Sequence, residues 1–260
     1  MFKRDLPNEE YHASPGISKS QLDVFARSPH HYYWQYKSGE TPPRRESDAM
    51  RQGTIIHAAI LEPERFSKEY VVGELRDKRS KKWKDFVEEC ANDGKCALTQ
   101  IEYERAMRCQ TSVMKNSYAA AALSDGEAEV SAFTEEPEAD GMQVRSRFDW
   151  LTQGAIVDLK TTVDAGPAFA QSIRKFRYHL QAAMYTRVGE LCGITNCAFV
   201  FVVVERDFPY GVGVYELDPS DASRGLHMYY DLITRLSDCE KTNEWPGYTT
   251  GIETIQAYTR

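Results

Sequence analysis

The sequence lacks any long apolar run and any excess of positive charge. No stretch approaches the roughly 18 consecutive apolar residues of a membrane span, and the opening MFKRDLPNEEYH lacks the apolar segment of a signal peptide. We therefore expect a cytoplasmic protein that does not bind a membrane. Because the formal net charge is −7, the surface as a whole does not attract nucleic acid, and any such site must be a local basic channel.

Cysteine is scarce and scattered. The six cysteines include no CxxC pair and have no histidine pair nearby, so the spacing that a zinc site requires is missing. We interpret them as reduced thiols, most of them packed in the interior. They stand at positions 90, 96, 109, 192, 197 and 239.

Internal repeats and low-complexity tracts are also missing, which excludes a repeat architecture. With 260 residues, of which 42% are hydrophobic, the chain can bury the core of one large domain over residues 1–260. The charged, weakly periodic segment 67–100 is predicted to leave the main fold as an excursion that contains a helix around Lys82 to Ala91. The proline-containing segment 38–50 is predicted to be a loop.

Helical and strand periodicities alternate along the rest of the chain. Helical spacing comes first, strand alternation follows, and a helix then separates the first group of strands from the second. This order predicts an α/β fold with a central mixed sheet flanked by helices, in which the first three strands form an antiparallel meander. Expected helices cover 17–36 as a pair, 51–66, 99–123, 169–191 and 219–238, and expected strands cover 127–136, 142–151, 154–162, 197–205 and 210–217.

Asp149, Asp158 and Lys160 form the most informative pattern. Both aspartates stand between apolar strand residues, where an unpaired carboxylate is costly, and Lys160 shares a strand face with Asp158. Two carboxylates that hold a divalent ion, with an amine beside the attacking water, are what metal-dependent phosphodiester hydrolysis uses. The alternative is that the aspartates stand at strand ends, where they turn into loops or pair with Arg145 or Arg147.

Other polar residues are ambiguous when each is taken alone. Glu129, on the neighbouring strand, is either a third carboxylate of the site or a solvent-facing glutamate. His57 lies on a helix whose other face is apolar, so it is either a metal ligand or a packed core residue. Gln181 and Tyr185 are four residues apart on one predicted helix, so they share a face and can meet a substrate phosphate or base together.

Basic residues that could contact DNA occur in three places. One group precedes the predicted helix at 178–191, where a solvated helix face is the alternative to a phosphate-contacting role. A second lies in 76–84, the strongest local excess of positive charge, and a third lies on the strand at 142–151. The candidate DNA-binding residues are Arg145, Arg147, Arg174, Lys175, Arg177, Lys81 and Lys82.

Several stretches resemble one nuclease family in the same order. Asp149, DLK at 158–160 and QAAMY at 181–185 resemble the PD-(D/E)xK core of RecB-like nucleases. The segment from Gly53 to His57 resembles the Gly-x-x-x-His motif upstream of that core, and ISKSQLDVFARSPHHYYWQY resembles its N-terminal signature. Within this branch, the chain resembles RecE-type exonuclease domains over most of residues 10–235.

The resemblance implies a PD-(D/E)xK, restriction-endonuclease-like core and a specific activity. A RecE-type enzyme is a Mg²⁺-dependent exonuclease, with Mn²⁺ as a substitute, that digests one strand of a double-stranded DNA end from 5′ to 3′. It leaves a 3′ single-stranded overhang for recombination by strand annealing. Such proteins form a toroidal homotetramer and act with a RecT-type single-strand annealing protein, so the same partners are expected here.

The resemblance also implies a set of metal ligands. By position in the motifs, His57, Asp149, Asp158 and the backbone carbonyl of Leu159 would bind the ion. Glu129 would be a less direct contact, either to a water on the ion or to a second ion. The role of Leu159 comes from the motif alone, because its apolar side chain would not suggest it.

The resemblance also implies roles for the remaining motif residues, and the sequence differs from the usual motif at two positions. Lys160 would orient or deprotonate the attacking water, and Gln181 and Tyr185 would lie near the DNA backbone. Phe148 replaces the proline of the motif's name, and Asp replaces the commoner Glu of the second carboxylate position, as is frequent in this branch. Some relatives hold an iron–sulfur cluster whose first cysteine precedes a proline; Ser28 stands there and no C-terminal cysteine triplet follows, so no such cluster is expected.

Two alternative hypotheses share the same fold. A non-catalytic module that binds DNA ends would be expected to have lost Asp149, Asp158 or Lys160, and all three are present. A structure-specific or sequence-specific endonuclease would keep all three residues. Covalently closed circular DNA distinguishes the enzymes, because an exonuclease leaves it intact and an endonuclease nicks it.

Overall fold

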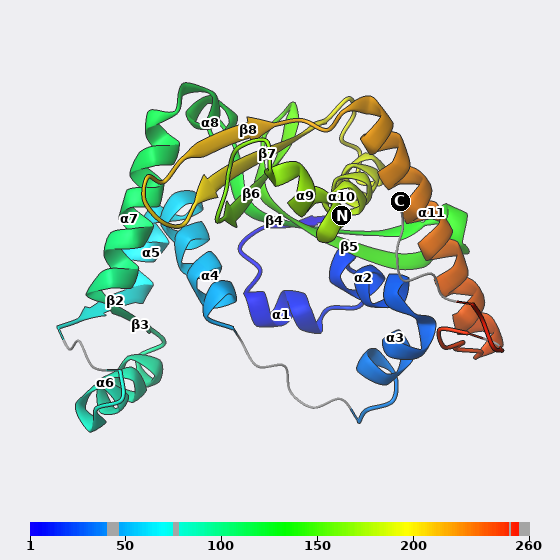
Figure 1. Ribbon diagram of the computed structural model, residues 1–260, viewed down its shortest axis with the longest axis horizontal. Helices are drawn as coiled ribbons and strands as arrows, with labels where there is room; N and C mark the ends of the chain where they lie inside the picture. The colour runs from blue at the N-terminus through cyan, green and yellow to red at the C-terminus, as the bar shows by residue number, and fades with distance from the viewer. Residues whose placement is uncertain (41–46, 75–77, 250, 255–260) are drawn as a thin grey trace.

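Six strands form the central sheet of the computed structural model, which describes residues 1–40, 47–74, 78–249 and 251–254 (Figure 1). Neighbouring strands are antiparallel except β6 and β7, which run parallel over eight paired positions. The expected mixed sheet is therefore confirmed. In order across the sheet the strands are β1 (Phe2–Lys3), β4 (Glu127–Glu136), β5 (Met142–Leu151), β6 (Ala155–Thr162), β7 (Ala198–Glu205) and β8 (Val212–Tyr215).

Helices connect the two parallel strands, as parallel pairing requires a crossover. The chain leaves β6 and passes through α9 (Phe169–Lys175) and α10 (Tyr178–Leu191) before it returns as β7. The long helix α11 (Pro219–Thr242) then packs along α10. Because α10 also contacts β4, β5 and β7, the side chains on its inner face meet the middle of the sheet.

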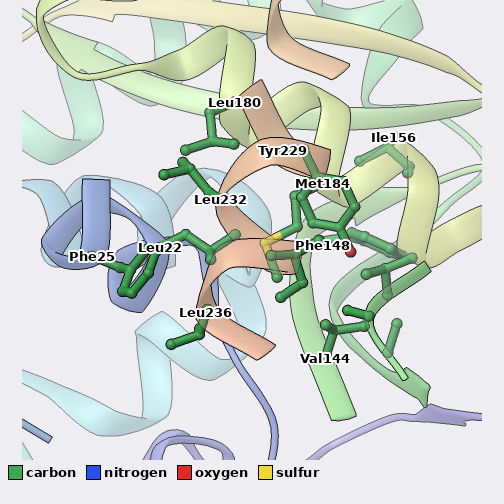
Figure 2. Packing of buried hydrophobic residues seen from close by; sticks show 14 of the residues in the cluster. Leu22, Phe25, Val144, Phe148, Ile156, Leu180, Met184, Tyr229, Leu232 and Leu236 are labelled. Atoms are coloured by element: carbon green, nitrogen blue, oxygen red, sulfur yellow. The ribbon is translucent and has the colours of Figure 1, made fainter. Parts of the chain in front are cut away.

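Two hydrophobic clusters occupy the two faces of the sheet. One cluster joins β4 and β5 to α10, α11 and α2, and Figure 2 shows its packing around Phe148, Met184 and Tyr229. The other cluster joins β6 and β7 to α4 (Asp48–Leu61), α7 (Gln100–Lys115) and α8 (Ser117–Ala122). Strand β6 alternates between them, since Ile156 packs in the first cluster and Leu159 in the second.

Three short helices precede the main fold. The expected pair at 17–36 consists of α2 (Lys19–Arg27) and α3 (Pro29–Tyr36). Ser18 and Gln21 form a capping box that starts α2, and the Ser28 hydroxyl accepts a hydrogen bond from the His31 backbone to start α3. The sequence analysis did not predict α1 (Asn8–Ala13) or strand β1.

Two expected helices are each divided. The helix expected at 51–66 becomes α4 and α5 (Pro63–Glu69), because Glu62 leaves the helical conformation before Pro63. The start of α4 also occupies the end of the segment expected as a loop, of which residues 41–46 lie outside the described residues. The helix expected at 99–123 becomes α7 and α8, because the Asn116 side chain accepts hydrogen bonds from the first backbone groups of α8.

Residues 67–74 and 78–100 form an arm beside the main sheet (Figure 1). Its expected helix is α6 (Lys81–Asn92), which connects two parallel strands, β2 (Tyr70–Gly73) and β3 (Cys96–Thr99). A small cluster around Trp83 packs α6 against these strands. Strands of four residues are too short for alternation to reveal them in the sequence. None of the helices in the described ranges is both long and apolar enough to span a membrane.

Gly225 sets how closely α11 approaches α10. A Cβ atom at this position would overlap the carbonyl oxygen of His179 near the start of α10. Gly225→Ala is therefore expected to lower the free energy of unfolding by about 1–3 kcal/mol, as measured by chemical denaturation. The exposed change Ser223→Ala on the same helix should stay within about 0.5 kcal/mol of wild type. Equal stability of both variants would mean that α11 can move away from α10 without lowering the free energy of unfolding.

Candidate active site

Strands β5 and β6 separate at the two aspartates. Their ladder consists of Leu151 with Ile156 and Trp150 with Val157, so continued pairing would place Asp149 opposite Asp158. Like charges directly opposite each other destabilise a sheet. Instead, the carboxylate oxygen Oδ2 of Asp149 accepts a hydrogen bond of 2.8 Å from the backbone of Leu159.

Asp158 lies at the centre of a hydrogen-bonded group. The Nζ atom of Lys160 is 2.6 Å from its Oδ2 atom, and Nε2 of Gln181 on α10 donates to its Oδ1 atom at 2.6 Å. The side chain is 1% exposed. The two-residue period of β6 directs Asp158 and Lys160 towards α10, so the predicted shared face is observed, and Gln181 completes the contact from the helix.

Glu129 lies on β4, opposite Asp149 on the neighbouring strand β5. Its neighbours Ala128 and Val130 pair with the residues on either side of Asp149. Its φ angle is +53°, a left-handed conformation that is unfavourable for a residue with a side chain. Ala128 packs in one hydrophobic cluster and Val130 in the other. The strand is thus distorted where the third carboxylate meets the site, and Glu129 forms an ion pair with Arg147 at 3.2 Å.

The three carboxylates concentrate negative charge. Burial and, after it, the charge of Asp149 together raise the pKa of Glu129 to about 8. Burial likewise raises the pKa of Asp158 to about 6, although Lys160 opposes the shift, and it raises the pKa of Asp149. A nearby cation favours the charged form of a carboxylate, so a bound divalent ion would lower the pKa values of all three carboxylates.

His57 reaches the site from α4. Its Nδ1 atom is 3.8 Å from Oδ2 of Asp149, and its ring hydrogen bonds with the backbone of Leu159. Burial and, after it, the Lys160 charge together lower the pKa of His57 to about 4, so the ring is neutral at pH 7 and keeps a lone pair for a metal. His57 also lines a cavity of about 410 Å³ with Glu129 and Arg147.

Tyr185 supports the site from one turn further along α10. Its hydroxyl hydrogen bonds with the Gln181 side chain, and burial holds its pKa well above the usual value. The ring packs against Phe148 and Phe199 at centroid distances of 5.6 and 6.2 Å. The shared face predicted for Gln181 and Tyr185 is observed, and in this structure Gln181 contacts the Asp158 carboxylate.

Arg145 and Arg147 hold the N-terminal segment on the sheet. Nη2 of Arg145 donates to the His12 carbonyl at 3.2 Å, and Arg147 donates to the Leu6 carbonyl and to Asn8. The ring of Tyr11 lies between them, 5.2 and 5.0 Å from the two guanidinium carbons. Among the described contacts neither arginine forms an ion pair with Asp149 or Asp158, as the alternative interpretation required.

The other candidate DNA contacts lie apart from the carboxylates. Arg174 and Lys175 are exposed at the end of α9, and Arg177 precedes α10, 3.8 Å from Asp23. The two arm lysines are exposed at the start of α6, away from β6 (Figure 1). These two lysines are Lys81 and Lys82. Arg147 is the predicted contact that lines the cavity beside His57.

Two residues near Lys160 were missed by the sequence analysis. Nζ of Lys160 lies 4.8 Å from the ring centroid of Tyr178, at the start of α10. Nζ of Lys19, at the start of α2, lies 5.6 Å from the same ring. Neither residue has a spacing that relates it to Lys160 in the sequence, and Lys19 stands within the N-terminal signature, which was interpreted only as a helix start and a family motif.

The donor atoms suit a hard divalent cation. In the described part of the chain, no three histidine, cysteine or acidic side chains are gathered as a ready-made metal site, because Asp149 and Asp158 are engaged by Leu159, Lys160 and Gln181. The buried Oδ2 atom of Asp158 faces the Lys160 ammonium group at 2.6 Å, so this position already holds positive charge of the kind that a bound cation would supply. Carboxylate oxygens together with a neutral imidazole fit Mg²⁺ or Mn²⁺.

Metal-free protein is expected to lose stability as the pH rises towards 8. The pKa values of Glu129 and Asp158 are raised in the folded state to about 8 and about 6, so the folded protein holds protons that the unfolded chain has released. This stabilisation is complete below about pH 4 and declines from there as the pH rises through each folded-state pKa. Mg²⁺ should bind the ionised carboxylates and therefore raise the melting temperature more at pH 8 than at pH 6.

Thermal unfolding with and without Mg²⁺ at the two pH values measures this difference, which we expect to be on the order of 5 °C. Asp231→Asn, an exposed change on α11, is the matched control and should behave as wild type. An equal Mg²⁺ effect at pH 6 and pH 8, in wild type and control alike, would contradict the prediction.

The chain matches a family model and resembles a solved structure. Residues 18–258 match the family described as a PDDEXK-like domain of unknown function (DUF3799). A crystal structure from Eubacterium rectale, described as a "putative exonuclease", aligns with a TM-score of 0.64 and 16% identity over 96% of this chain and 97% of the other. At that identity the likeness shows the fold alone. Among curated proteins, none matches the chain significantly.

The PD-(D/E)xK resemblance noted in the sequence and the expected fold class are thus confirmed. The matched residues include Asp149, Asp158 and Lys160, which the structure gathers where β5 and β6 separate. Helices on both faces of a mostly antiparallel sheet hold this group. With the match extending over residues 18–258, the chain belongs to the PDDEXK-like domain family and carries a nuclease fold.

Proposed function

We propose that the protein is a metal-dependent exodeoxyribonuclease that digests one strand of a double-stranded DNA end from 5′ to 3′. The observation that carries this proposal is the group of Asp149, Asp158 and Lys160 at the point where β5 and β6 separate. Its residue types match phosphodiester hydrolysis. The polarity and the 3′ overhang for strand annealing rest on the RecE-type resemblance of the sequence.

Residues from four elements would bind the metal ion. His57, Asp149, Asp158 and the Leu159 carbonyl would hold Mg²⁺, or Mn²⁺ in its place, with Glu129 as an outer contact. When bound, the ion would neutralise charge on the attacking and leaving oxygens of the phosphodiester. These residues approach from α4, β4, β5 and β6, so binding would also fix the helix α4 against the sheet.

Lys160 is the residue that would act on the attacking water. Its ammonium group is held 2.6 Å from Asp158, and the Asp158 charge is among the causes that raise its pKa. A protonated Lys160 orients the water and stabilises negative charge, which requires no proton transfer to the amine. Gln181 would keep the Asp158 carboxylate in position, and Tyr185 would in turn orient Gln181.

DNA would enter beside α4, where His57, Glu129 and Arg147 line the cavity of about 410 Å³. The candidate contacts on α6 and α9 lie on separate parts of the surface, so they would meet the duplex away from the reacting phosphate. A chain of net charge −7 would hold DNA by enclosing it, which is consistent with the proposed toroidal homotetramer. We propose a RecT-type annealing protein as the partner that receives the overhang.

Labelled linear duplexes test this function. With Mg²⁺ present, a 5′ label should be released early as a mononucleotide or short product, and a 3′ label should remain on long DNA. Covalently closed plasmid should stay intact under the same conditions. Nicking of the plasmid would favour the endonuclease, and binding to DNA ends without any release would favour the non-catalytic module.

A further inference from the structure

The ring of Tyr178 contacts both ammonium groups near the carboxylates. Nζ of Lys160 lies 4.8 Å from the ring centroid, and Nζ of Lys19 lies 5.6 Å from it. Cations are attracted to an aromatic ring by its quadrupole, most strongly where water is excluded. The side chains of Lys160 and Lys19 are only 16% and 14% exposed, so both contacts are shielded.

Other aromatic residues fix the ring in place. Phe169 stacks on Tyr178 with centroids 5.9 Å apart, and Phe176 lies 5.6 Å away. Phe201 of β7 is a third neighbour, at 6.1 Å. Because α9, α10 and β7 each contribute to this packing, the ring is a rigid surface, whereas a lysine side chain alone has four rotatable bonds.

Lys19 connects the same ring to the N-terminal signature. Its Nζ atom is 2.6 Å from Asp23 one turn along α2, and it donates to the Phe176 carbonyl at 2.7 Å. The start of α2 is therefore attached to the junction between α9 and α10. Burial lowers the pKa of Lys19, and the charge of Lys160 adds to this shift, so the two ammonium groups repel each other. The attraction of each group to the ring offsets part of this repulsion.

We propose that Tyr178 is a positioning residue that holds the Lys160 ammonium group beside Asp158 and links it, through Lys19, to helix α2. The proposal rests on the proposed nuclease function for its kinetic consequence. The ring faces and not the hydroxyl make the contact, so phenylalanine should replace tyrosine. Leucine fills much of the same space without a ring face, so it should leave Lys160 free to move.

Two variants separate these possibilities in a nuclease assay. Tyr178→Phe should keep kcat within about twofold of wild type. Tyr178→Leu should lower kcat roughly ten- to a hundredfold, since small displacements of a reacting group have effects of this size, and KM for DNA should stay unchanged. Tyr118→Leu, the same substitution at an exposed tyrosine on α8, is the control and should resemble wild type.

A second readout does not depend on activity. Reductive methylation followed by peptide mass spectrometry should modify Lys160 and Lys19 slowly in wild type and in Tyr178→Phe, and severalfold faster in Tyr178→Leu, with exposed Lys81 as the reference. Equal kcat and equal labelling in the leucine and phenylalanine variants would overturn the proposal. If wild type cleaves no DNA, the proposed function fails, and the labelling result still decides whether Tyr178 positions Lys160.

Discussion

Asp158→Ala is expected to abolish DNA hydrolysis while binding of DNA persists. The carboxylate is the proposed metal ligand, is 1% exposed and contacts both Lys160 and Gln181, so its loss removes the ion and frees the amine. An ion that stabilises transition-state charge contributes several kcal/mol, and each 1.4 kcal/mol is a factor of ten in rate. We therefore expect cleavage to fall by at least about 10³-fold.

Asp158→Asn provides the structural control for this change. The amide oxygen can still accept the hydrogen bond from Gln181, and the side-chain volume is kept, so the variant should fold and bind a labelled duplex as wild type does. Its cleavage should nevertheless be lost. Thermal unfolding and gel-shift measurements accompany the assay. Retained hydrolysis by purified, folded Asp158→Ala protein would remove Asp158 from the site.

Lys160→Met is expected to lower kcat by roughly 10²–10⁴-fold, the usual contribution of a residue that acts on a proton in transfer. Methionine keeps the length and the apolar part of the side chain and removes the ammonium group. The ligands on Asp149 and Asp158 remain, so Mg²⁺ should still bind when measured by calorimetry. This combination of lost turnover and retained metal distinguishes Lys160 from the carboxylates.

A second substitution separates the charge of Lys160 from its proton. Lys160→Arg retains a positive charge that does not deprotonate near neutral pH. Partial recovery of kcat relative to Lys160→Met would indicate that charge and orientation are what the residue supplies. No recovery would indicate that proton transfer or the shape of the amine is essential. Unchanged turnover in Lys160→Met would contradict any chemical role for this side chain.

Sequence periodicity predicted which side chains share a face, but it did not predict their contacts. Alternation along β6 correctly placed Asp158 and Lys160 on one face, because the strand period is fixed by backbone geometry. The hydrogen bond from Leu159 to Asp149 depends on the separation of β5 from β6. That separation is a property of two paired strands, and no single segment of sequence encodes it.

Local distortions and tertiary contacts explain the remaining differences. The left-handed conformation of Glu129 lies within a regular strand pattern, so propensity does not reveal it. Lys19 and Lys160 are far apart in sequence and meet only because α2 packs beside the α9–α10 junction. By contrast, Pro63 and Asn116 carry local signals that divide two helices, and a stricter reading of those residues would have found the breaks.

The most direct test of the central claim is release of labelled nucleotides from a linear duplex, measured with Mg²⁺ and then with excess chelator. We predict release by wild-type protein with Mg²⁺, none after chelation, and none from Asp158→Ala at equal protein concentration. Release that continues in chelator or in Asp158→Ala would contradict a metal-dependent site built on Asp149, Asp158 and Lys160. So would the absence of release by wild type with either Mg²⁺ or Mn²⁺.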